Sequence, residues 1–250
     1  MPGASRFLRL LNWLEENVLS KMAKSANSIL SVGCGTGAFD EKILQYLSGR
    51  MDHVEYVGIE PNALEAGEFL KRMQAQSSDQ IDADVSVLVE KFGDRSFGKD
   101  FDLIVFVQSI YYLGDRNGAI DAALKALRPG GVVIIAVAPD ESLNTIANLI
   151  WQRQMGQKSW FSDDMRHHFD TRGIAYSETR ISANLNATAC FSSESPDGKN
   201  IIDFIVQTRT DRLPETLQQN ISEFLLSISE AEDGNTCLPH PVDIFTCKNG

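Results

Sequence analysis

The chain has 250 residues, of which 43% are hydrophobic and 23% charged, and its formal net charge is −11 at pH 7. This length allows one α/β domain or two small ones, with a core that needs neither disulfides nor a metal. The acidic balance argues against binding of a nucleic-acid backbone and favours a small cationic substrate.

The four cysteines are scattered, without a C-x-x-C pair, so neither a disulfide framework nor a zinc site is indicated. We expect reduced thiols in a cytoplasmic protein. Residues 1–18 contain no sustained apolar run of the kind found in a signal peptide, because arginine, asparagine and glutamate interrupt them. No stretch of about 18 apolar residues is present, so no membrane span is expected.

The first half of the chain alternates predicted helices and strands. An amphipathic helix is expected over 4–24, helices over 39–48 and 61–76, and strands over 28–32, 53–60, 83–92, 101–108 and 131–138. A further helix before the last of these strands is expected to end at Pro129–Gly131. This alternation predicts an α/β fold with a doubly wound, mostly parallel sheet.

The regular alternation of helices and strands ends after residue 140. Helices are predicted over 142–155, from Ser162, over 199–209 and over 214–229. Strands are expected over 174–182, 186–191 and 242–247, and residues 230–241 read as an exposed loop. The simplest interpretation is one domain over 1–250, with an N-terminal helix or lid (1–25), a cofactor-binding core (26–140) and a substrate-shaping half (141–250).

Three glycines follow the first predicted strand, in "ILSVGCGTGAFD" (residues 29–40). Gly33-x-Gly35-x-x-Ala38 fits the dinucleotide-binding fingerprint, and Glu60, at the end of the next strand, stands where an acid would bind ribose hydroxyls. Gly33, Gly35 and Gly37 also fit the G-x-G-x-G loop of class I S-adenosylmethionine (SAM) methyltransferases. A glycine-rich turn without a ligand is the third possibility.

The context favours SAM over NAD. "LRPGG" before the strand at 131–138 is common in methyltransferases, as is the loop spelling "VGCGTG". A dehydrogenase would be expected to supply a base after the strand at 101–108, such as Tyr-x-x-x-Lys. Tyr111 and Tyr112 have no lysine at that spacing.

The stretch "FDLIVFVQSIYYLGD" (101–115), where Gln108 is followed by a tyrosine pair, resembles histamine N-methyltransferase. The resemblance continues in "VGIEPN", in "YSETRISANLNATACF", in "IIDFIV" and in the last strand, so it covers about residues 28–248. It implies a class I methyltransferase fold (Rossmann-like, with a seven-stranded sheet), SAM as the cofactor and methyl transfer to a nitrogen of a small amine.

The resemblance also implies the site residues. Gly33, Gly35 and Gly37 would line the methionine part of SAM, and Glu60 would bind the ribose diol. Further cofactor contacts are expected from Pro61, Glu65, Glu90, Val107 and Gln108. The substrate would meet Gln108, Tyr111, Tyr112 and His240.

Two of these residues are the catalytic candidates. A polar Gln108 at the end of an apolar strand lies where open α/β sheets bind ligands, although its amide could instead cap the next turn. His240 stands where the family has an asparagine, and could act as a base or a hydrogen-bonding group, or be a loop histidine without substrate contact.

The chain also departs from the family. It begins too late to hold the family's acidic lid residue in the same register, although Glu15 or Glu16 could substitute from the first helix. Together with His240 in place of the asparagine, this makes histamine itself a doubtful substrate. The alternatives are an O- or S-methyltransferase of a small metabolite and a non-catalytic SAM-binding module. No metal is expected, because His167 and His168 read as part of a charged helix face. The expected protein has no nucleic-acid or membrane partner and is a monomer or weak homodimer.

Overall fold

The computed structural model describes residues 6–76, 82–156, 159–192 and 195–248. The chain divides into two compact units, each assembled from separate segments. Unit 1 comprises the described parts of 1–9, 138–165 and 180–243, and unit 2 those of 10–137, 166–179 and 244–250.

A seven-stranded sheet has the order β3-β2-β1-β4-β5-β10-β6. Its strands are β1 (Ser28–Val32), β2 (Val54–Ile59), β3 (Ala83–Leu88), β4 (Phe101–Val107), β5 (Leu127–Val137), β6 (Tyr176–Ile181) and β10 (Val242–Lys248). The pairs β3–β2, β2–β1, β1–β4 and β4–β5 are all parallel. The predicted doubly wound, mostly parallel seven-stranded sheet is therefore confirmed.

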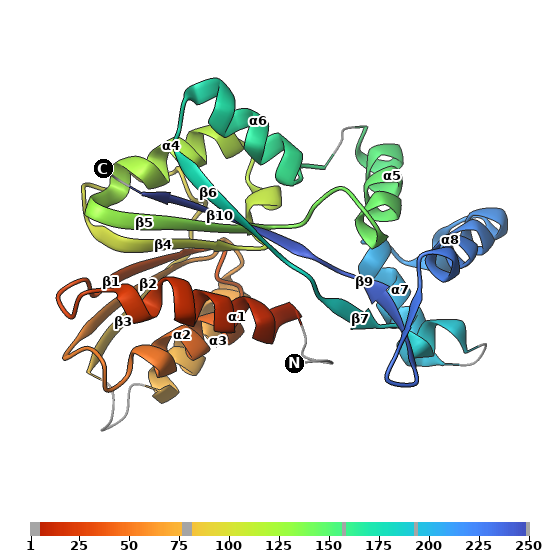
Figure 1. Cartoon of the computed structure of the whole chain (residues 1–250), viewed down its shortest axis with the longest axis horizontal. Coiled ribbons are helices and arrows are strands. Elements are labelled where there is room, and N and C mark those ends of the chain that lie inside the picture. Colours follow the sequence, from red (N-terminus) through yellow and green to blue (C-terminus); the bar gives the residue numbers. More distant parts are fainter. Residues whose placement is uncertain (1–5, 77–81, 157–158, 193–194, 249–250) are drawn as a thin grey trace. The chain divides into compact units, whose positions relative to one another are not determined.

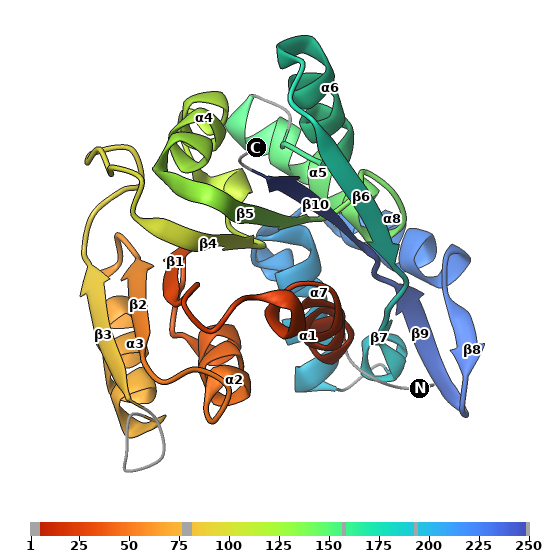
Figure 2. The ribbon, with the colours of Figure 1, turned by 60° about the vertical axis from the view of Figure 1, so that its left-hand side comes forward.

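Helices cover both faces of this sheet within unit 2. Figures 1 and 2 show α2 (Ala38–Leu47) and α3 (Ala63–Gln76) on one face and α4 (Arg116–Ala126) on the other. All residues of β1 are buried, as are most of β4 and β5, which explains their nearly continuous apolar sequences. Helix α4 begins at a cap in which the Asp115 carboxylate accepts a hydrogen bond from the Gly118 N–H.

The remaining helices are α1 (Arg6–Asn17), α5 (Leu143–Met155), α6 (Ser162–Arg172), α7 (Pro196–Val206) and α8 (Glu215–Ser227). Short 3₁₀ turns occupy Leu19–Lys21, Ile110–Tyr112, Thr188–Phe191 and Thr210–Arg212. The core of unit 1 brings together buried residues of α5, α7 and α8, among them Ile150, Ile205 and Leu225. Among the described residues, no helix has both the length and the apolar character needed to cross a membrane.

Two sequence predictions for the second half were wrong. Residues 230–241 are not a loop: β8 (Glu230–Glu232) and β9 (Asn235–Pro239) form a hairpin, and β9 also pairs with β7 (Asn184–Asn186). The turn is Asp233–Gly234, and both residues have positive φ, as hairpin turns of this kind require. The strand expected over 186–191 is absent except for Asn186, the last residue of β7, because Thr188–Phe191 forms a 3₁₀ helix.

Near residue 129, the helix α4 ends at Ala126, earlier than expected. Leu127 is already paired with Phe101 on β4, and the regular pairing resumes only at Leu103 and Val132. The Pro-Gly turn is thus an irregularity inside the beginning of β5 rather than the end of a helix.

Candidate active site

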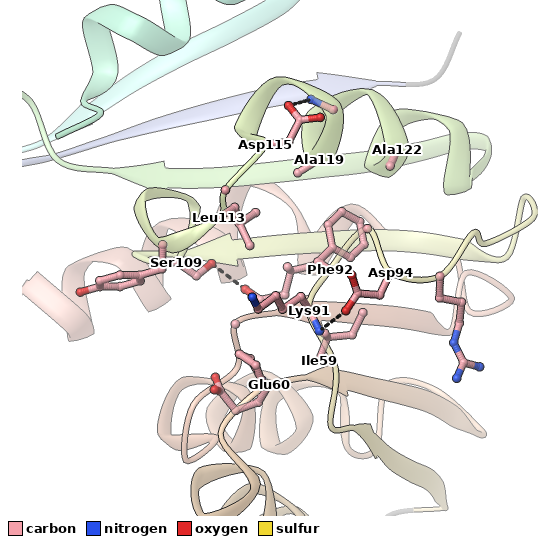
Figure 3. A pocket seen from close by; sticks show the side chains of 18 of the residues that line it. Ile59, Glu60, Lys91, Phe92, Asp94, Ser109, Leu113, Asp115, Ala119 and Ala122 are labelled. Carbon is pink, nitrogen blue, oxygen red and sulfur yellow. Dashed lines mark hydrogen bonds between the residues drawn. The ribbon is translucent and has the colours of Figure 1, made fainter. Parts of the chain in front are cut away.

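A cavity of about 1190 Å³ opens at the carboxyl ends of β1, β2 and β4, entirely within unit 2. In Figure 3, Glu60 lies on one side of this cavity and Ala119 and Ala122 of α4 lie on the other, with Phe92 and Leu113 between them. Parallel α/β sheets bind ligands at this edge, because the strand ends and helix starts present their unpaired backbone groups there.

The glycine loop begins where β1 ends, and all three of its glycines have positive φ, from 53° at Gly35 to 76° at Gly37. A side chain at Gly33 would meet the Ser109 Cβ at 2.5 Å, and one at Gly37 would meet the Phe69 ring at 2.7 Å. At Gly35, by contrast, the nearest atom is the Glu65 Oε2 at 3.6 Å. Gly33 and Gly37 are therefore required by packing, whereas Gly35 leaves the backbone open towards the cavity.

Glu60 is buried, and hydrogen bonds from the backbone fix its carboxylate. The Gly35 N–H donates to Oε2 at 3.1 Å, and the Asn62 N–H donates to Oε1 at 2.9 Å. Each carboxylate oxygen keeps a further lone pair for a ligand. The predicted ribose-binding acid is thus held in a single orientation at the wall of the cavity.

Behind the loop lies a buried polar pair. The Tyr56 hydroxyl donates to Asp40 Oδ1 at 2.8 Å, which links β2 to the first turn of α2. Burial raises the pKa of Asp40, although hydrogen bonds from Ser31 and Tyr56 partly counter it. Burial, and then the charges of Asp40 and Glu60, raise the pKa of Cys34 far above its usual value. Cys34 therefore stays a thiol and is not a nucleophile.

Gln108 follows β4 and lines the cavity, with a φ of 55° that is unusual outside glycine. Its backbone N–H donates to the Ala136 carbonyl at 3.0 Å, and its side-chain Oε1 accepts from the Tyr111 hydroxyl at 2.6 Å. Tyr111 is half-buried and does not line the cavity itself. Tyr112 lines it with a side chain that is 72% exposed. The two adjacent tyrosines are thus in different environments, Tyr111 bonded to Gln108 and Tyr112 exposed at the cavity wall.

The other predicted cofactor residues fall into two groups. Pro61 and Glu65 line the same cavity as Gly33, Gly35, Glu60 and Gln108. Gly37, Glu90 and Val107 are not among the lining residues; the Glu90 carboxylate instead accepts hydrogen bonds from Arg95, whose Nε lies 2.9 Å from Oε1. Six of the nine residues predicted to bind the cofactor therefore line one cavity in the structure.

His240 lies in unit 1, between β9 and β10. The Arg6 guanidinium donates to its Nε2, and its backbone N–H donates to the Ala183 carbonyl at 2.7 Å. Burial, and then the charge of Arg6, lower the pKa of His240 to about 3. In this arrangement the imidazole is neutral near pH 7 and its Nε2 is engaged, so it acts as a hydrogen-bond acceptor.

His167 and His168 lie on α6. His167 is exposed and His168 is buried beside Phe169, with ring centroids 5.9 Å apart. Within the described residues, no group of three or more metal-ligating side chains is placed to hold an ion. The cysteines in the described part of the chain are not joined by disulfides.

Several residues of the site are not among those predicted from the sequence. The Ser109 hydroxyl donates to the Val32 carbonyl at 2.6 Å and so ties the end of β4 to the end of β1. Phe92 and Phe97, stacked with centroids 6.3 Å apart, line the cavity, as do Ala119 and Ala122. A polar residue directly after a buried strand is a signal that could have identified Ser109. The apolar lining carries no such signal.

Comparison with known proteins agrees with this geometry. Residues 30–133 match the model of a methyltransferase domain. Histamine N-methyltransferase of Danio rerio is 21% identical over 246 residues, which cover 90% of this chain and 82% of that protein. A ubiquinone biosynthesis O-methyltransferase of Psychrobacter cryohalolentis is 26% identical over 137 residues, half of this chain and 51% of that protein.

Among solved structures, an N-methyltransferase from Bradyrhizobium japonicum, determined in complex with S-adenosyl-L-homocysteine (SAH), superposes with a TM-score of 0.52. It is 18% identical, and the alignment covers 99% of this chain and 89% of that one. This likeness shows a shared fold.

The sheet order, the glycine loop and the matched segment together define a SAM-dependent methyltransferase of the class I fold. Within that class, the chain resembles histamine N-methyltransferase over most of its length.

The residues of the cavity fit SAM. Gly35 leaves room for a ligand against the backbone, and Glu60 offers carboxylate oxygens to a diol. The buried Nε2 of Gln108 has no hydrogen-bond partner among the described residues, so this residue of the cavity wall keeps an unused donor group.

Proposed function

We propose that this protein transfers the methyl group of SAM to a nitrogen atom of a small amine. The observation that carries the proposal is the arrangement of Gly35, Glu60 and Gln108 at one cavity, on the carboxyl ends of three adjacent parallel strands. The choice of nitrogen is supported by the extended resemblance to histamine N-methyltransferase.

Each residue then has a defined task. Glu60, fixed by two backbone N–H groups, would accept hydrogen bonds from the ribose hydroxyls, with Pro61 and Glu65 beside the nucleoside. Gly33, Gly35 and Gly37 would shape the loop around the methionine part, and Glu90 and Val107 would flank the cofactor. SAM supplies an electrophilic methyl group on a positively charged sulfur.

The protein's remaining task is to hold a neutral amine in line with that methyl group. Holding two reactants in this orientation contributes several kcal/mol to barrier lowering. Gln108 would lie closest to the reacting atoms, with Tyr111 and Tyr112 as parts of the substrate wall. For His240 the hydrogen-bonding role is the better supported one, because its low pKa leaves it neutral while Arg6 is bound.

A second candidate is an O- or S-methyltransferase of a small metabolite. It is supported by the similarity to a ubiquinone biosynthesis O-methyltransferase, which spans half of the chain. A SAM-binding module without catalysis is the third; the fixed orientation of Glu60 and the strained Gln108 argue against it.

The deciding experiment has two stages. Calorimetric titration of the purified chain with SAH, and then with NAD, tests the cofactor. Transfer of tritium from methyl-labelled SAM to panels of small amines, phenols and thiols then tests the acceptor. Label found only on amines supports the proposal; label only on phenols or thiols replaces it with the second candidate. SAH binding without transfer to any panel supports the third.

Three further expectations belong to this proposal: a single methyltransferase domain whose residues 141–250 select the acceptor, a cytoplasmic location, and a monomeric or weakly dimeric state. Each stays a prediction.

A further inference from the structure

The two hydrogen-bonding groups of the Gln108 side chain are in opposite situations. Its Oε1 accepts from the Tyr111 hydroxyl at 2.6 Å, and the 3₁₀ turn Ile110–Tyr112 brings the tyrosine into position. Its Nε2 is shielded from solvent, and no acceptor in the described part of the chain pairs with it. The carbonyl is thus satisfied, whereas the NH₂ group is not.

Both the backbone and the side chain of Gln108 are in unfavourable states. A φ of 55° lies in the left-handed region, which is unfavourable for a residue with a side chain. A buried donor without a partner adds a desolvation cost. A ligand that brings a hydrogen-bond acceptor to Nε2 would remove the second of these costs, and Gln108 already lines the cavity where a ligand would bind.

We infer that Tyr111 is a positioning residue, which holds the Gln108 carbonyl so that the side-chain NH₂ group meets the bound ligand. This inference rests on the proposed SAM site. The ligand atom at Nε2 is then an acceptor, such as an oxygen of the cofactor or of an amine substrate. A protonated amine nitrogen offers only donors and gains nothing from this NH₂ group, and the lone pair of a neutral amine must stay free to attack the methyl group, so the acceptor is an oxygen.

Tyr112 provides a matched control for Tyr111. Its ring meets that of Tyr111 edge to face, with centroids 6.0 Å apart, and both residues belong to the same 3₁₀ turn. No hydrogen bond found among the described residues joins the Tyr112 hydroxyl to Gln108.

Sinefungin makes the test possible without a known substrate. This SAM analogue carries an ammonium group where SAM carries its methyl group, whereas SAH carries neither. The full chain, its Tyr111→Phe variant and its Tyr112→Phe variant are titrated calorimetrically with both ligands. The readout is the preference for sinefungin, expressed as the ratio of the SAH Kd to the sinefungin Kd.

In Tyr111→Phe the amide is free to rotate and can turn its carbonyl towards the ammonium group. We expect the preference for sinefungin to rise about tenfold, as for one hydrogen bond to a charged group. Tyr112→Phe alters a residue of the cavity wall and can change both affinities, but its hydroxyl does not hold Gln108 in the described structure, so the ratio of the two Kd values should stay at the wild-type value. An unchanged or lower preference in Tyr111→Phe, including an equal loss of both ligands, assigns Tyr111 a merely structural role and overturns the inference.

Gln108→Met tests the orientation of the amide at the other partner of this hydrogen bond. It also provides a test if the Tyr111→Phe variant does not fold. Removing an NH₂ group that faces the ammonium should maintain or raise the preference for sinefungin. A fall would show that the carbonyl faces the ligand, which contradicts the inference. Failure of the wild-type chain to bind SAH would instead reject the proposed function, so the two failures are distinguishable.

Discussion

The Gly35 N–H donates a hydrogen bond to the Glu60 carboxylate at 3.1 Å, and so joins the glycine loop after β1 to the acid after β2. The Asn62 N–H binds the other oxygen of the same carboxylate. The loop and the acid are thus one unit, in which each fixes the position of the other.

Glu60→Ala should weaken SAH binding about 10- to 100-fold, because charge-assisted hydrogen bonds contribute about 1.5–3 kcal/mol each and the loop loses its partner as well. Isothermal titration calorimetry measures this. Glu55→Ala, which removes an exposed glutamate of β2, the strand that Glu60 follows, is the control and should bind SAH normally. Equal affinities of Glu60→Ala and the wild type would remove Glu60 from the cofactor site.

Two glycine substitutions in one loop should have different effects. Gly37→Ala places a methyl group 2.7 Å from the buried Phe69 ring at a φ of 76°, and should cost about 2–4 kcal/mol of unfolding free energy. Gly35→Ala has only the backbone cost of about 1–2 kcal/mol, but its methyl group narrows the cavity. Urea unfolding and SAH titration should therefore rank the two variants in opposite orders. The same order in both assays would contradict this assignment.

His240 should make stability depend on pH. Its pKa is lowered to about 3 in the folded protein, from an ordinary value of 6.5, by burial and by Arg6. The unfolded chain therefore binds a proton first as the pH falls. The stabilisation is fully present above about pH 6.5 and is lost progressively towards pH 3.

Urea unfolding between pH 7 and pH 4 should show a shallower decline for His240→Asn than for the wild type. Arg6→Met removes the smaller of the two causes and should give an intermediate slope. Identical slopes in the wild type and His240→Asn would mean that the imidazole titrates normally in the folded state.

Arg180 and Asp243 form an ion pair between β6 and β10, in which the Asp243 side chain is fully buried. Arg180 Nε lies 2.7 Å from Oδ1, and the Glu141 carboxylate binds the other side of the guanidinium at 3.1 Å. Arg180→Met removes a guanidinium that makes two hydrogen bonds to the buried carboxylate, and should destabilise the protein by about 2–4 kcal/mol in urea unfolding.

The matched change is Arg209→Met, which breaks the exposed pair of Arg209 and Asp211. It should lower the unfolding free energy much less than Arg180→Met does, because solvent screens exposed pairs. Similar losses for the two variants would show that burial of Asp243 is not what makes its ion pair important.

Much of the fold could be predicted because local patterns agree with the final packing. The strand at 28–32 coincides with β1, and helix α3 ends at the predicted Gln76, since buried apolar residues define both. Gly35, Glu60 and Gln108 were expected together because each follows a strand of a parallel sheet, and those strand ends meet at one edge.

The other features of the fold and the site depend on tertiary contacts, which the spacing of apolar residues in the sequence does not reveal. Cys237 and Leu238 are buried in a hairpin where the sequence predicts an exposed loop, although Asp233–Gly234 is a typical hairpin turn. Tyr111 and Tyr112 are adjacent and identical in sequence, yet only the first binds Gln108. That difference arises from the direction of one short 3₁₀ turn.

The place of β10 in the sheet has a consequence for the order of folding. This strand lies between β5 and β6, although it follows both in the chain. During synthesis β6 leaves the ribosome before the strand that separates it from β5 exists. Its backbone groups on the β10 side must remain unpaired until then, and an unpaired strand edge can associate with other chains. Closure of the sheet therefore requires a contact between distant segments, which makes it a slow step.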